Sequence, residues 1–341
     1  MFKKLTVIGV ISVLSLISSF VFGQTWNVIP QTSGVETTLN EVYFDSKSNR
    51  GWVVGNDGVI LFTGDKGETW VKQDGGVTGA LLSVYFANEN EGWAGGDGGT
   101  IIHTKDGGTT WTKQNTDITE KIRGIFFANN SKGWAVGDGG KIIVTRDGGA
   151  RWEPQTSKTN QALEAVHFAP PRPGEAEVTQ GWAVGGNGVA VHTANGGNVW
   201  MIQPTKITDP LYGVFFDSET RGWAVGKSGT VLRTTNGGLE WGQSAAAAAQ
   251  GKNLYDVLFV TAADGWCVGS AGKLLHSSDG KSWEAIESNI SKALWAISYV
   301  SSYELWAVGD GGTILYIRSS QYPVDPKGKL GTTWGSMKRM Y

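Results

Sequence analysis

The chain alternates short apolar runs with tight, glycine-rich turns, and this alternation continues along most of its length. The runs are rich in β-branched and aromatic residues, a composition typical of β-strands. One stretch, GWAVGDGGKIIVTRDGGARW over residues 133–152, holds two apolar runs, a glycine turn between them and a second glycine turn after them. Long stretches with a 3.6-residue apolar period, which would indicate helices, are absent from the sequence. The pattern therefore predicts antiparallel β-hairpins.

A tryptophan in the second apolar run marks a repeat along the chain. Its spacings are 41, 41, 48, 41, 43 and 40 residues for Trp52, Trp93, Trp134, Trp182, Trp223, Trp266 and Trp306. Each unit begins with an alternating run such as LYGVFFD, followed by the tryptophan strand and a third strand. In six units the sequence T-x-D-G-G-x-x-W, or a variant of it, then leads into a short fourth strand. Four strands in each of seven units predict an all-β fold, a seven-bladed β-propeller of four-stranded antiparallel blades.

The ends of the repeat predict how the ring closes. The seventh unit has no T-x-D-G-G-x-x-W after TILYIRSS, whereas QTWNVIPQT, around Trp26, reads as a fourth strand without the other three. We therefore expect the N-terminal strand to complete the last blade, with residues 24–319 forming the propeller and residues 320–341 a C-terminal tail. The competing closure uses GTTWGSMKRMY within that tail. The insertions at residues 170–180 and 244–253 are expected to be surface loops that only lengthen the connections, the alternative being that either is a functional loop.

Residues 1–23 predict a cleaved signal peptide. Lys3 and Lys4 precede an apolar run over residues 5–22, and Gly23 ends the segment at the expected cleavage site. The alternative is an uncleaved membrane anchor. Cleavage changes the formal net charge from −2 to −4, and an acidic protein gives no support for nucleic-acid binding. We expect an exported monomer, located in the periplasm, in a lumen or outside the cell.

The T-x-D-G-G-x-x-W sequences are predicted to be structural turns. An Asp or Asn at the start of a turn accepts hydrogen bonds from backbone N–H groups two or three residues further on, and glycine permits the positive φ angles that follow. We call each of these sequences a box. A calcium loop needs several oxygen ligands close together in sequence, and each box offers one. Catalysis needs a single site rather than copies around a ring. The residues at this position are Asp65, Asp106, Asp147, Asn195, Asn236 and Asp279.

The second residue of each innermost strand differs from unit to unit, in contrast to the repeated residues around it. In a propeller this position is expected to ring the mouth of the central channel, and residues that vary there are free of the demands of the scaffold. Tyrosine, tryptophan and arginine are enriched in binding hot spots. We therefore predict a partner-binding site, the alternative being that some of these side chains plug the channel. Its residues are Asn40, Arg123, Glu164, Tyr212, Tyr255 and Trp295, with Leu82 in the remaining unit.

Two other sets of residues are predicted to be structural. Arg50, Lys132 and Arg221 precede strand tryptophans and are expected on the opposite rim, as solvated charges rather than a basic binding patch. His103, His192 and His276 occupy one repeated strand position, which indicates packing rather than a metal cluster. No metal or cofactor is expected.

The repeated boxes resemble the Asp-box, or bacterial neuraminidase repeat, of sialidase-type propellers. The fuller pattern, L-x-x-V-x-F…G-W-A-V-G-x-x-G-x-I…T-x-D-G-G-x-x-W, is similar to the photosystem II stability and assembly factor family over about residues 26–318. That resemblance implies an exported seven-bladed propeller that acts as an assembly chaperone. It also implies a protein partner, such as an extended segment of a membrane-protein client, and no catalytic residues.

The alternative function is a carbohydrate-binding surface protein or a sialidase-like glycoside hydrolase. Sialidases of this fold combine three arginines, a tyrosine–glutamate pair, an acidic residue and an early Arg-Ile-Pro, and that tripeptide does not occur in the sequence. A pair of carboxylates for glycoside hydrolysis stays open, because their separation in space decides that chemistry. We expect a non-enzymatic, protein-binding scaffold.

Overall fold

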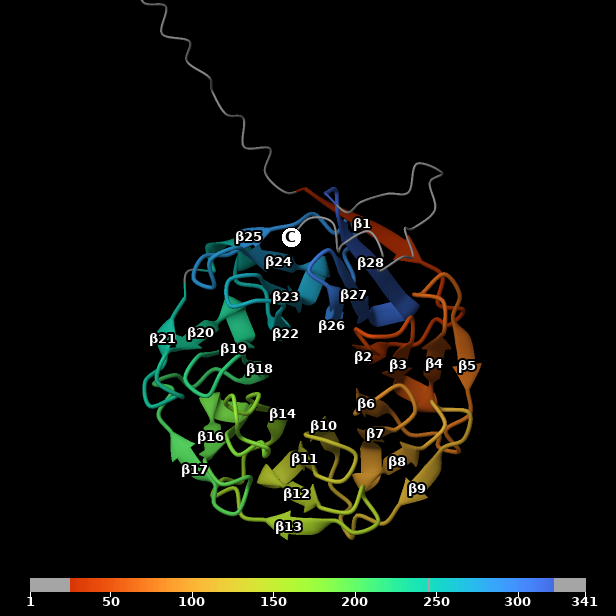
Figure 1. Cartoon of the computed structure of the whole chain (residues 1–341). Helices are drawn as coiled ribbons and strands as arrows, with labels where there is room; N and C mark the ends of the chain where they lie inside the picture. The colour runs from red at the N-terminus through yellow and green to blue at the C-terminus, as the bar shows by residue number, and fades with distance from the viewer. Residues whose placement is uncertain (1–24, 245, 322–341) are drawn as a thin grey trace, which may run out of the picture.

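The computed structural model describes residues 25–244 and 246–321, and within these ranges 28 strands form seven four-stranded antiparallel sheets arranged in a ring (Figure 1). The predicted all-β, seven-bladed propeller is confirmed, with one sheet to each blade. The predicted signal peptide, residues 1–23, and most of the predicted tail lie outside the described residues. Within the described ranges, no helix has the length and apolar character that a membrane crossing requires.

Each blade runs from an inner strand beside the channel to an outer strand at the rim. The inner strands are β2 (Leu39–Phe44), β6 (Leu81–Phe86), β10 (Ile122–Phe127), β14 (Leu163–Phe168), β18 (Leu211–Phe216), β22 (Leu254–Phe259) and β26 (Leu294–Ser301). The second strands are β3 (Gly51–Gly55), β7 (Gly92–Gly96), β11 (Gly133–Gly137), β15 (Gly181–Gly185), β19 (Gly222–Gly226), β23 (Gly265–Gly269) and β27 (Glu304–Gly309). The third strands are β4 (Ile60–Thr63), β8 (Ile101–Thr104), β12 (Ile142–Thr145), β16 (Ala190–Thr193), β20 (Val231–Thr234), β24 (Leu274–Ser277) and β28 (Thr313–Ser319). The outer strands are β5 (Val71–Gln73), β9 (Thr112–Gln114), β13 (Glu153–Gln155), β17 (Met201–Gln203), β21 (Gly242–Gln243), β25 (Glu284–Ala285) and β1 (Trp26–Gln31).

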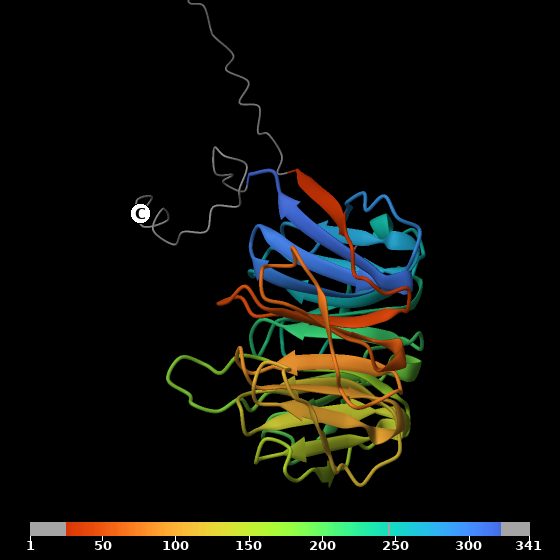
Figure 2. The same cartoon turned by 90° about the vertical axis from the view of Figure 1, so that its right-hand side faces the viewer.

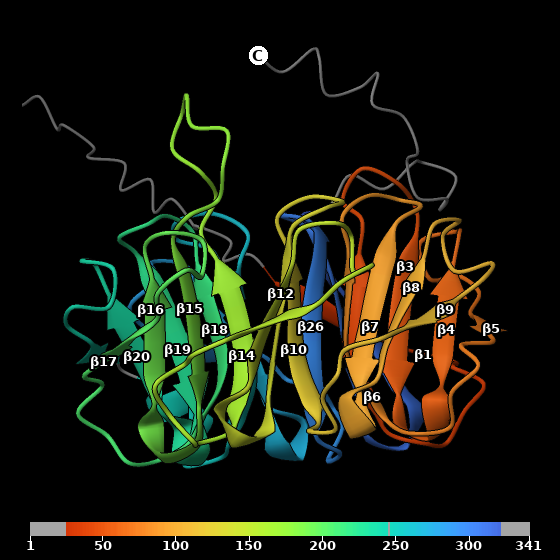
Figure 3. The same cartoon turned by 90° about the horizontal axis from the view of Figure 1, so that it is seen from below.

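A 3-10 turn joins the second strand to the third in every blade. These turns are η1 (Asn56–Gly58), η2 (Asp97–Gly99), η3 (Asp138–Gly140), η4 (Gly186–Gly188), η5 (Lys227–Gly229), η7 (Ser270–Gly272) and η8 (Asp310–Gly312). They lie along the lower face in Figure 3, which we call the η face. The T-x-D-G-G-x-x-W turns connect third strands to outer strands and therefore lie on the opposite face, which we call the box face.

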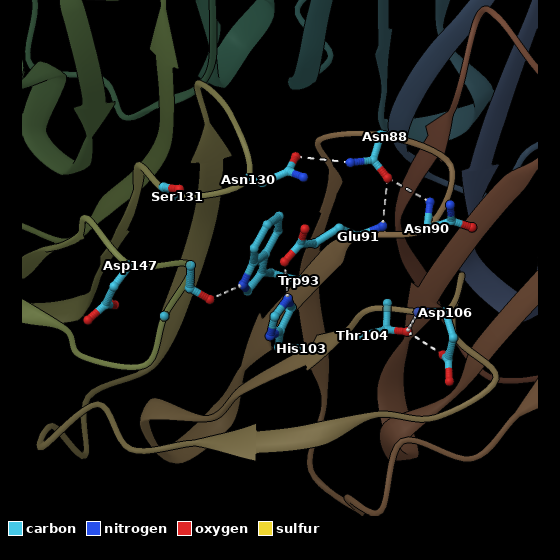
Figure 4. A network of polar contacts seen from close by, with 12 residues as sticks. Asn88, Asn90, Glu91, Trp93, His103, Thr104, Asp106, Asn130, Ser131 and Asp147 are labelled. Carbon is cyan, nitrogen blue, oxygen red and sulfur yellow. Dashed lines mark hydrogen bonds and ion pairs between the residues drawn. The ribbon is translucent and has the colours of Figure 1, made fainter.

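The repeated tryptophans fill the space between neighbouring blades. Trp93 is fully buried and stacks on Phe127 of the next blade, with ring centroids 3.6 Å apart. His103 stacks on its other side at 4.7 Å, and the indole Nε1 donates to the carbonyl oxygen of Gly148 at 3.0 Å (Figure 4). Because this contact joins two blades, the packing of one blade positions the next. The same stacking occurs for Trp52 on Phe86, Trp134 on Phe168, Trp182 on Phe216 and Trp223 on Phe259.

The glycine before each of these tryptophans makes room for the phenylalanine of its own blade. A Cβ atom at Gly92 would lie 2.5 Å from the ring of Phe86, a distance that packed atoms do not tolerate. In the seventh blade Tyr299 stands at the phenylalanine position, and Leu305, fully buried, stands at the glycine position. Tyr299 is 37% exposed whereas Phe86 is buried, so the tyrosine ring does not fill the space that the phenylalanine rings take, and Leu305 fits at the glycine position.

The side chains of the boxes hold their own turns. Asp106 Oδ1 accepts the backbone N–H of Thr110 at 2.8 Å and the hydroxyl of Thr104 at 2.9 Å. Thr104 Oγ1 in turn accepts the backbone N–H of Gly108 at 2.7 Å. The hydrogen bond from Thr110 is the main reason that the pKa of Asp106 is lowered. The threonine at the start of the box is therefore as much a part of the turn as the acid.

The predicted spacing of these hydrogen bonds was wrong for most boxes. The N–H donor lies four residues beyond the Asp or Asn, rather than two or three, at Asp65, Asp106, Asp147, Asn195 and Asn236. In these five boxes the two residues directly after the Asp or Asn have positive φ angles, and they lengthen the turn. In the shortened box Asp279 accepts from Lys281 and Ser282, as predicted, because only Gly280 has a positive φ there.

The N-terminal strand closes the ring, as predicted. Strand β1 pairs antiparallel with β28, from Trp26 opposite Ser319 to Gln31 opposite Ile314 (Figures 1 and 2). Trp26 packs edge-on against Trp266 with ring centroids 4.5 Å apart, at a seam where the other blades use a phenylalanine. The competing segment GTTWGSMKRMY lies outside the described residues.

The two insertions differ from each other. The loop over residues 170–180 projects from the box face, as the yellow-green loop in Figure 3 shows. The alanine-rich insertion contains η6 (Ala247–Ala249), and Ala249 is fully buried in a core cluster with Trp223 and Leu254. The second insertion is therefore a surface loop that is anchored in the core, because Ala246, Ala248 and Ala249 pack against the neighbouring blades.

The three equivalent histidines have different polar partners. His103 Nε2 contacts the carboxylate of Glu91 at 3.2 Å, and His192 Nε2 contacts the amide oxygen of Gln180 at 2.9 Å. His276 lies between two carboxylates, Asp264 at 3.0 Å and Glu284 at 3.2 Å. Burial lowers the pKa of His192 to about 4. For His276, burial is outweighed by the two carboxylates, and its pKa is raised.

We expect His276 and His192 to contribute to stability with opposite pH dependence. A histidine whose pKa is higher in the folded than in the unfolded protein, such as His276, stabilises the fold below about pH 6.5. This contribution is lost as the pH rises through the pKa of the folded protein. His276→Gln should therefore cost more free energy of unfolding at about pH 5.5 than at about pH 8. His192, whose pKa is lowered, stabilises at high pH, so His192→Gln should show the reverse. Urea unfolding of both variants across this range measures the two slopes, and slopes of the same sign would contradict the assignment.

Candidate functional site

The mouth residues lie at β-bulges of the inner strands. In every blade the register between the inner and second strands shifts across this position, as it does between Ile122 and Gly124 on either side of Arg123. A bulged residue has no partner in the ladder, and its side chain is re-aimed. The structure places the predicted residues around one cavity of about 700 Å³ in the axial channel: Asn40, Leu82, Arg123, Glu164, Tyr212, Tyr255 and Trp295. We refer to these seven residues as the mouth.

Blades five to seven give the mouth an aromatic side. Tyr255 and Trp295 are stacked, with ring centroids 4.1 Å apart, and Tyr212 is tilted against Tyr255 at 5.4 Å. The indole Nε1 of Trp295 donates to Asp310 Oδ1 at 2.8 Å, which fixes the ring to turn η8. All three side chains are half-buried. They therefore form a continuous platform whose orientation is set before any ligand arrives.

Blades three and four give the mouth an ionic side. Arg123 Nε donates to Asp138 Oδ1 of turn η3 at 2.5 Å, and Nη1 donates to Glu164 Oε2 at 2.9 Å. The guanidinium group is thus held by one acid from its own blade and one from the next. Because two carboxylates surround one cation, this side of the mouth carries a net negative charge.

The remaining two blades provide a polar and an apolar position. Asn40 Nδ2 donates to Asn56 Oδ1 at 3.0 Å and to the carbonyl oxygen of Leu81 at 2.8 Å, so its amide links blades one and two. Leu82 follows at the same position in blade two and is half-buried. Contacts with the first residue of an η turn recur at Asn40, Arg123 and Trp295. They place the mouth at the η face.

Two carboxylates lie in the channel one residue beyond the mouth. Glu41 and Asp256 both line the axial cavity. Glu41 Oε1 accepts the backbone N–H of Val42 at 3.0 Å, and Asp256 accepts those of Val257 at 2.8 Å and Ile297 at 3.0 Å. Burial and the charge of Asp256 raise the pKa of Glu41. Burial raises the pKa of Asp256 to about 6.

Aromatic rings line the channel toward the box face. The fifth residues of the inner strands in blades one to five follow one another around the wall, with ring centroids 4.7–5.4 Å apart: Tyr43, Tyr85, Phe126, His167 and Phe215. Burial lowers the pKa of His167 to about 4, so the imidazole is neutral. Its Nδ1 accepts the backbone N–H of Phe216 at 3.3 Å, which ties blade four to blade five.

The two channel carboxylates, Glu41 and Asp256, were not among the site residues predicted from the sequence. The third residue of the inner strand is small in five blades (Ser83, Gly124, Ala165, Gly213 and Ala296) and acidic in two. Comparison of the repeats at this position would have singled out Glu41 and Asp256 in the same way as the mouth. The β-bulge could not be foreseen from the sequence. In a regular strand two successive residues face opposite ways, so Glu41 and Asp256 are not expected to face the channel together with the mouth residues that precede them.

The basic residues predicted on the opposite rim are compensated by neighbouring acids. Arg50 pairs with Glu89 at 4.0 Å, and Lys132 pairs with Glu177 at 3.5 Å. The Nε of Arg221 donates to Asp217 at 2.8 Å. The exposed Arg50–Glu89 pair contributes little to stability, whereas the side chains of Lys132 and Arg221 are partly buried and lie over the rings of Trp134 and Trp223. In the described part of the chain, no group of three or more His, Cys, Asp or Glu side chains is arranged to hold a metal ion.

Comparison with known proteins identifies the family. The model of the family described as "Photosynthesis system II assembly factor YCF48" matches residues 18–118, 110–210 and 200–294. The chain belongs to this family. Its members are assembly factors, as the family description states. Among curated proteins, no sequence matches the chain.

Solved structures share the fold at low sequence identity. "YCF48 bound to D1 peptide" has a TM-score of 0.68 and 22% identity, and the match covers 85% of this chain and 96% of that one. "YCF48 from Cyanidioschyzon merolae" has a TM-score of 0.69 and 20% identity, with coverage of 86% and 99%. A structure titled "Streptogramin B lyase structure" has a TM-score of 0.74 and 11% identity, with coverage of 86% and 98%. At these identities the similarity shows the fold alone, so the lyase carries no chemistry over to this chain.

Proposed function

We propose that this protein is an exported, non-enzymatic assembly factor that binds an extended segment of a membrane-protein client across the mouth. The family supports an assembly role, and a structure titled "YCF48 bound to D1 peptide" is of a propeller with a peptide ligand. The observation that carries the proposal is the mouth itself. Residues that the scaffold does not repeat gather there, and hydrogen bonds and stacking hold them in place.

A pre-organised mouth favours binding because little conformational entropy remains to be lost. Tyrosine and tryptophan present large, rigid contact areas with few rotatable bonds. Trp295 is held by Asp310 and by its stack with Tyr255, so the cost of ordering this platform is met during folding. The closed ring keeps the seven inner strands in fixed relative positions. The predicted signal peptide supports export, and we propose that the protein works as a monomer without a cofactor.

A library of random twelve-residue peptides displayed on phage tests the proposal without knowledge of the client. Peptides enriched on the immobilised protein are expected to lose at least about tenfold in affinity for Trp295→Ala and for Tyr255→Ala, because both substitutions remove a hot-spot aromatic side chain. Fluorescence anisotropy with the synthetic peptides measures the affinities. Leu239→Ala is the matched control, since Leu239 is 70% exposed in the box of blade five, far from the channel lining.

Two outcomes would contradict this proposal. One is that no peptide is enriched on a folded protein. The other is that the enriched peptides bind Trp295→Ala and Tyr255→Ala as tightly as the unmodified protein and lose affinity only for rim variants such as Leu239→Ala.

A carbohydrate ligand is the second candidate, and the stacked pair of Tyr255 and Trp295 favours it. A half-buried aromatic platform accepts the C–H face of a sugar ring as readily as a peptide side chain. Binding to an array of oligosaccharides, lost in Trp295→Ala, would support this candidate. Release of reducing sugar that Glu164→Gln abolishes would overturn the non-enzymatic proposal.

A further inference from the structure

Among the described residues, the channel beyond the mouth contains buried carboxyl groups that no basic side chain pairs with. The cavity is lined by the acidic residues Glu41, Glu164, Asp256 and Asp310 and by one basic residue, Arg123. Arg123 is already held between Glu164 and Asp138. In the described part of the chain, the hydrogen bonds to Glu41 and Asp256 come from backbone N–H groups alone. A buried carboxylate without a counter-charge is costly, so the pair is expected to take up protons or an external cation.

The surroundings of these carboxylates fit an organic cation better than a metal ion. Calcium requires six to eight oxygen ligands, and magnesium requires near-octahedral oxygen coordination. Here two carboxylates are present, with no third metal-ligating side chain grouped with them in the described residues. The other walls of the same cavity are aromatic, including Tyr43, Tyr85 and Trp295. Aromatic faces attract ammonium and guanidinium groups and also pack against their alkyl stems.

The distance from the mouth to the carboxylates suits a long basic side chain. Glu41 and Asp256 directly follow Asn40 and Tyr255 in sequence, and one residue along a strand spans about 3.4 Å. A side chain that enters between the mouth residues therefore reaches the carboxylates with a stem of a few carbon atoms, as lysine and arginine have.

We propose that the axial channel takes up a lysine or arginine side chain of the bound client segment, with its stem against the mouth aromatics and its charged end at Glu41 and Asp256. This inference rests on the proposed function, because it assigns the chemistry of the segment that the mouth binds. It predicts that the client segment carries an obligatory basic residue at one position. The mouth then provides the contact area, and the channel provides selectivity for charge.

Peptides enriched on the protein are expected to share one lysine or arginine. Replacement of that residue by norleucine, which keeps the stem and removes the charge, should weaken binding at least about tenfold, as expected for a charge-assisted hydrogen bond. The variants Glu41→Gln and Asp256→Asn should weaken the basic peptide by a similar factor and leave the norleucine peptide unaffected. Glu177→Gln is the matched control, because the side chain of Glu177 is 77% exposed on the box face.

A small-molecule experiment tests the channel without any peptide. Butylguanidinium and butylammonium chloride, titrated into the unmodified protein by calorimetry near pH 6, should bind and release protons, whereas neutral 1-pentanol should not. The proton release follows from the raised pKa values of Glu41 and Asp256, which a nearby cation lowers. It is measured from the dependence of the heat on the ionisation enthalpy of the buffer. Glu41→Gln should bind the cations more weakly and release fewer protons.

The outcomes separate this inference from the proposed function. Peptides that depend on Trp295 but bind equally well with norleucine would overturn the channel inference and leave the mouth as a peptide site. Failure to enrich any peptide, together with proton-linked binding of butylguanidinium, would overturn the proposed function while the channel still selects cations. Binding of 1-pentanol as tight as that of butylammonium would show an apolar cavity and overturn the inference.

Discussion

A chain that begins at Thr32, and therefore lacks β1, is expected to lose the closed ring and at least about 3–5 kcal/mol of its free energy of unfolding. The strand contributes six residue pairs to β28 and the side chain that covers Trp266, since Trp26 packs edge-on against that indole. Its removal exposes β28 as an open edge with apolar residues, a template for pairing with another chain. Urea unfolding and light scattering measure the two effects, in comparison with a chain that begins at Gln24.

The matched control restores the strand from outside. A synthetic peptide of residues 25–31 should bind the shortened chain and recover its stability, whereas the same peptide with Trp26→Ala should recover less. An unchanged urea midpoint for the chain that begins at Thr32 would contradict the role of β1. It would favour closure by GTTWGSMKRMY, the other segment of the sequence with a suitable tryptophan.

The fold could be predicted from the sequence because one set of packing requirements occurs seven times. A single Trp93 or Asp106 carries little information, but the same residues at a constant spacing define a unit and its number of strands. Details that depend on the local turn could not be predicted in this way. The hydrogen-bond spacing in the boxes follows from how many residues adopt a positive φ, and the burial of Ala249 follows from a tertiary contact with blade five.

The candidate site could be predicted in part, by setting the repeated residues aside. Positions such as Arg123 and Trp295 differ between units, and the structure places them in one cavity. Glu41 and Asp256 were missed because strand alternation assigns neighbouring residues to opposite faces. The bulges break that alternation, and the sequence of a single unit does not reveal them.

Substitution of Trp93 by alanine is expected to lower the free energy of unfolding by about 3–5 kcal/mol, the cost of truncating a large core side chain. Trp93 is fully buried between Phe127 and His103, so alanine leaves a cavity between two blades. The carbonyl oxygen of Gly148 keeps the hydrogen bond from Gln114 Nε2 at 3.1 Å, so the loss is mainly one of packing. Trp93→Phe, which keeps a stacked ring, should cost less. Urea unfolding at constant pH gives all three free energies.

Trp295→Ala is the contrasting substitution, because it removes a tryptophan that the scaffold does not repeat. Its side chain is half-buried at the mouth, where it stacks on Tyr255 and donates to Asp310. We expect a smaller loss of stability than for Trp93→Ala and a loss of peptide affinity, whereas folded Trp93→Ala should bind peptides with unchanged affinity. An equal loss of stability in the two variants, with unchanged peptide affinity in both, would make Trp295 a plug of the channel. The comparison thus separates tryptophans that stabilise the ring from a tryptophan that binds the peptide.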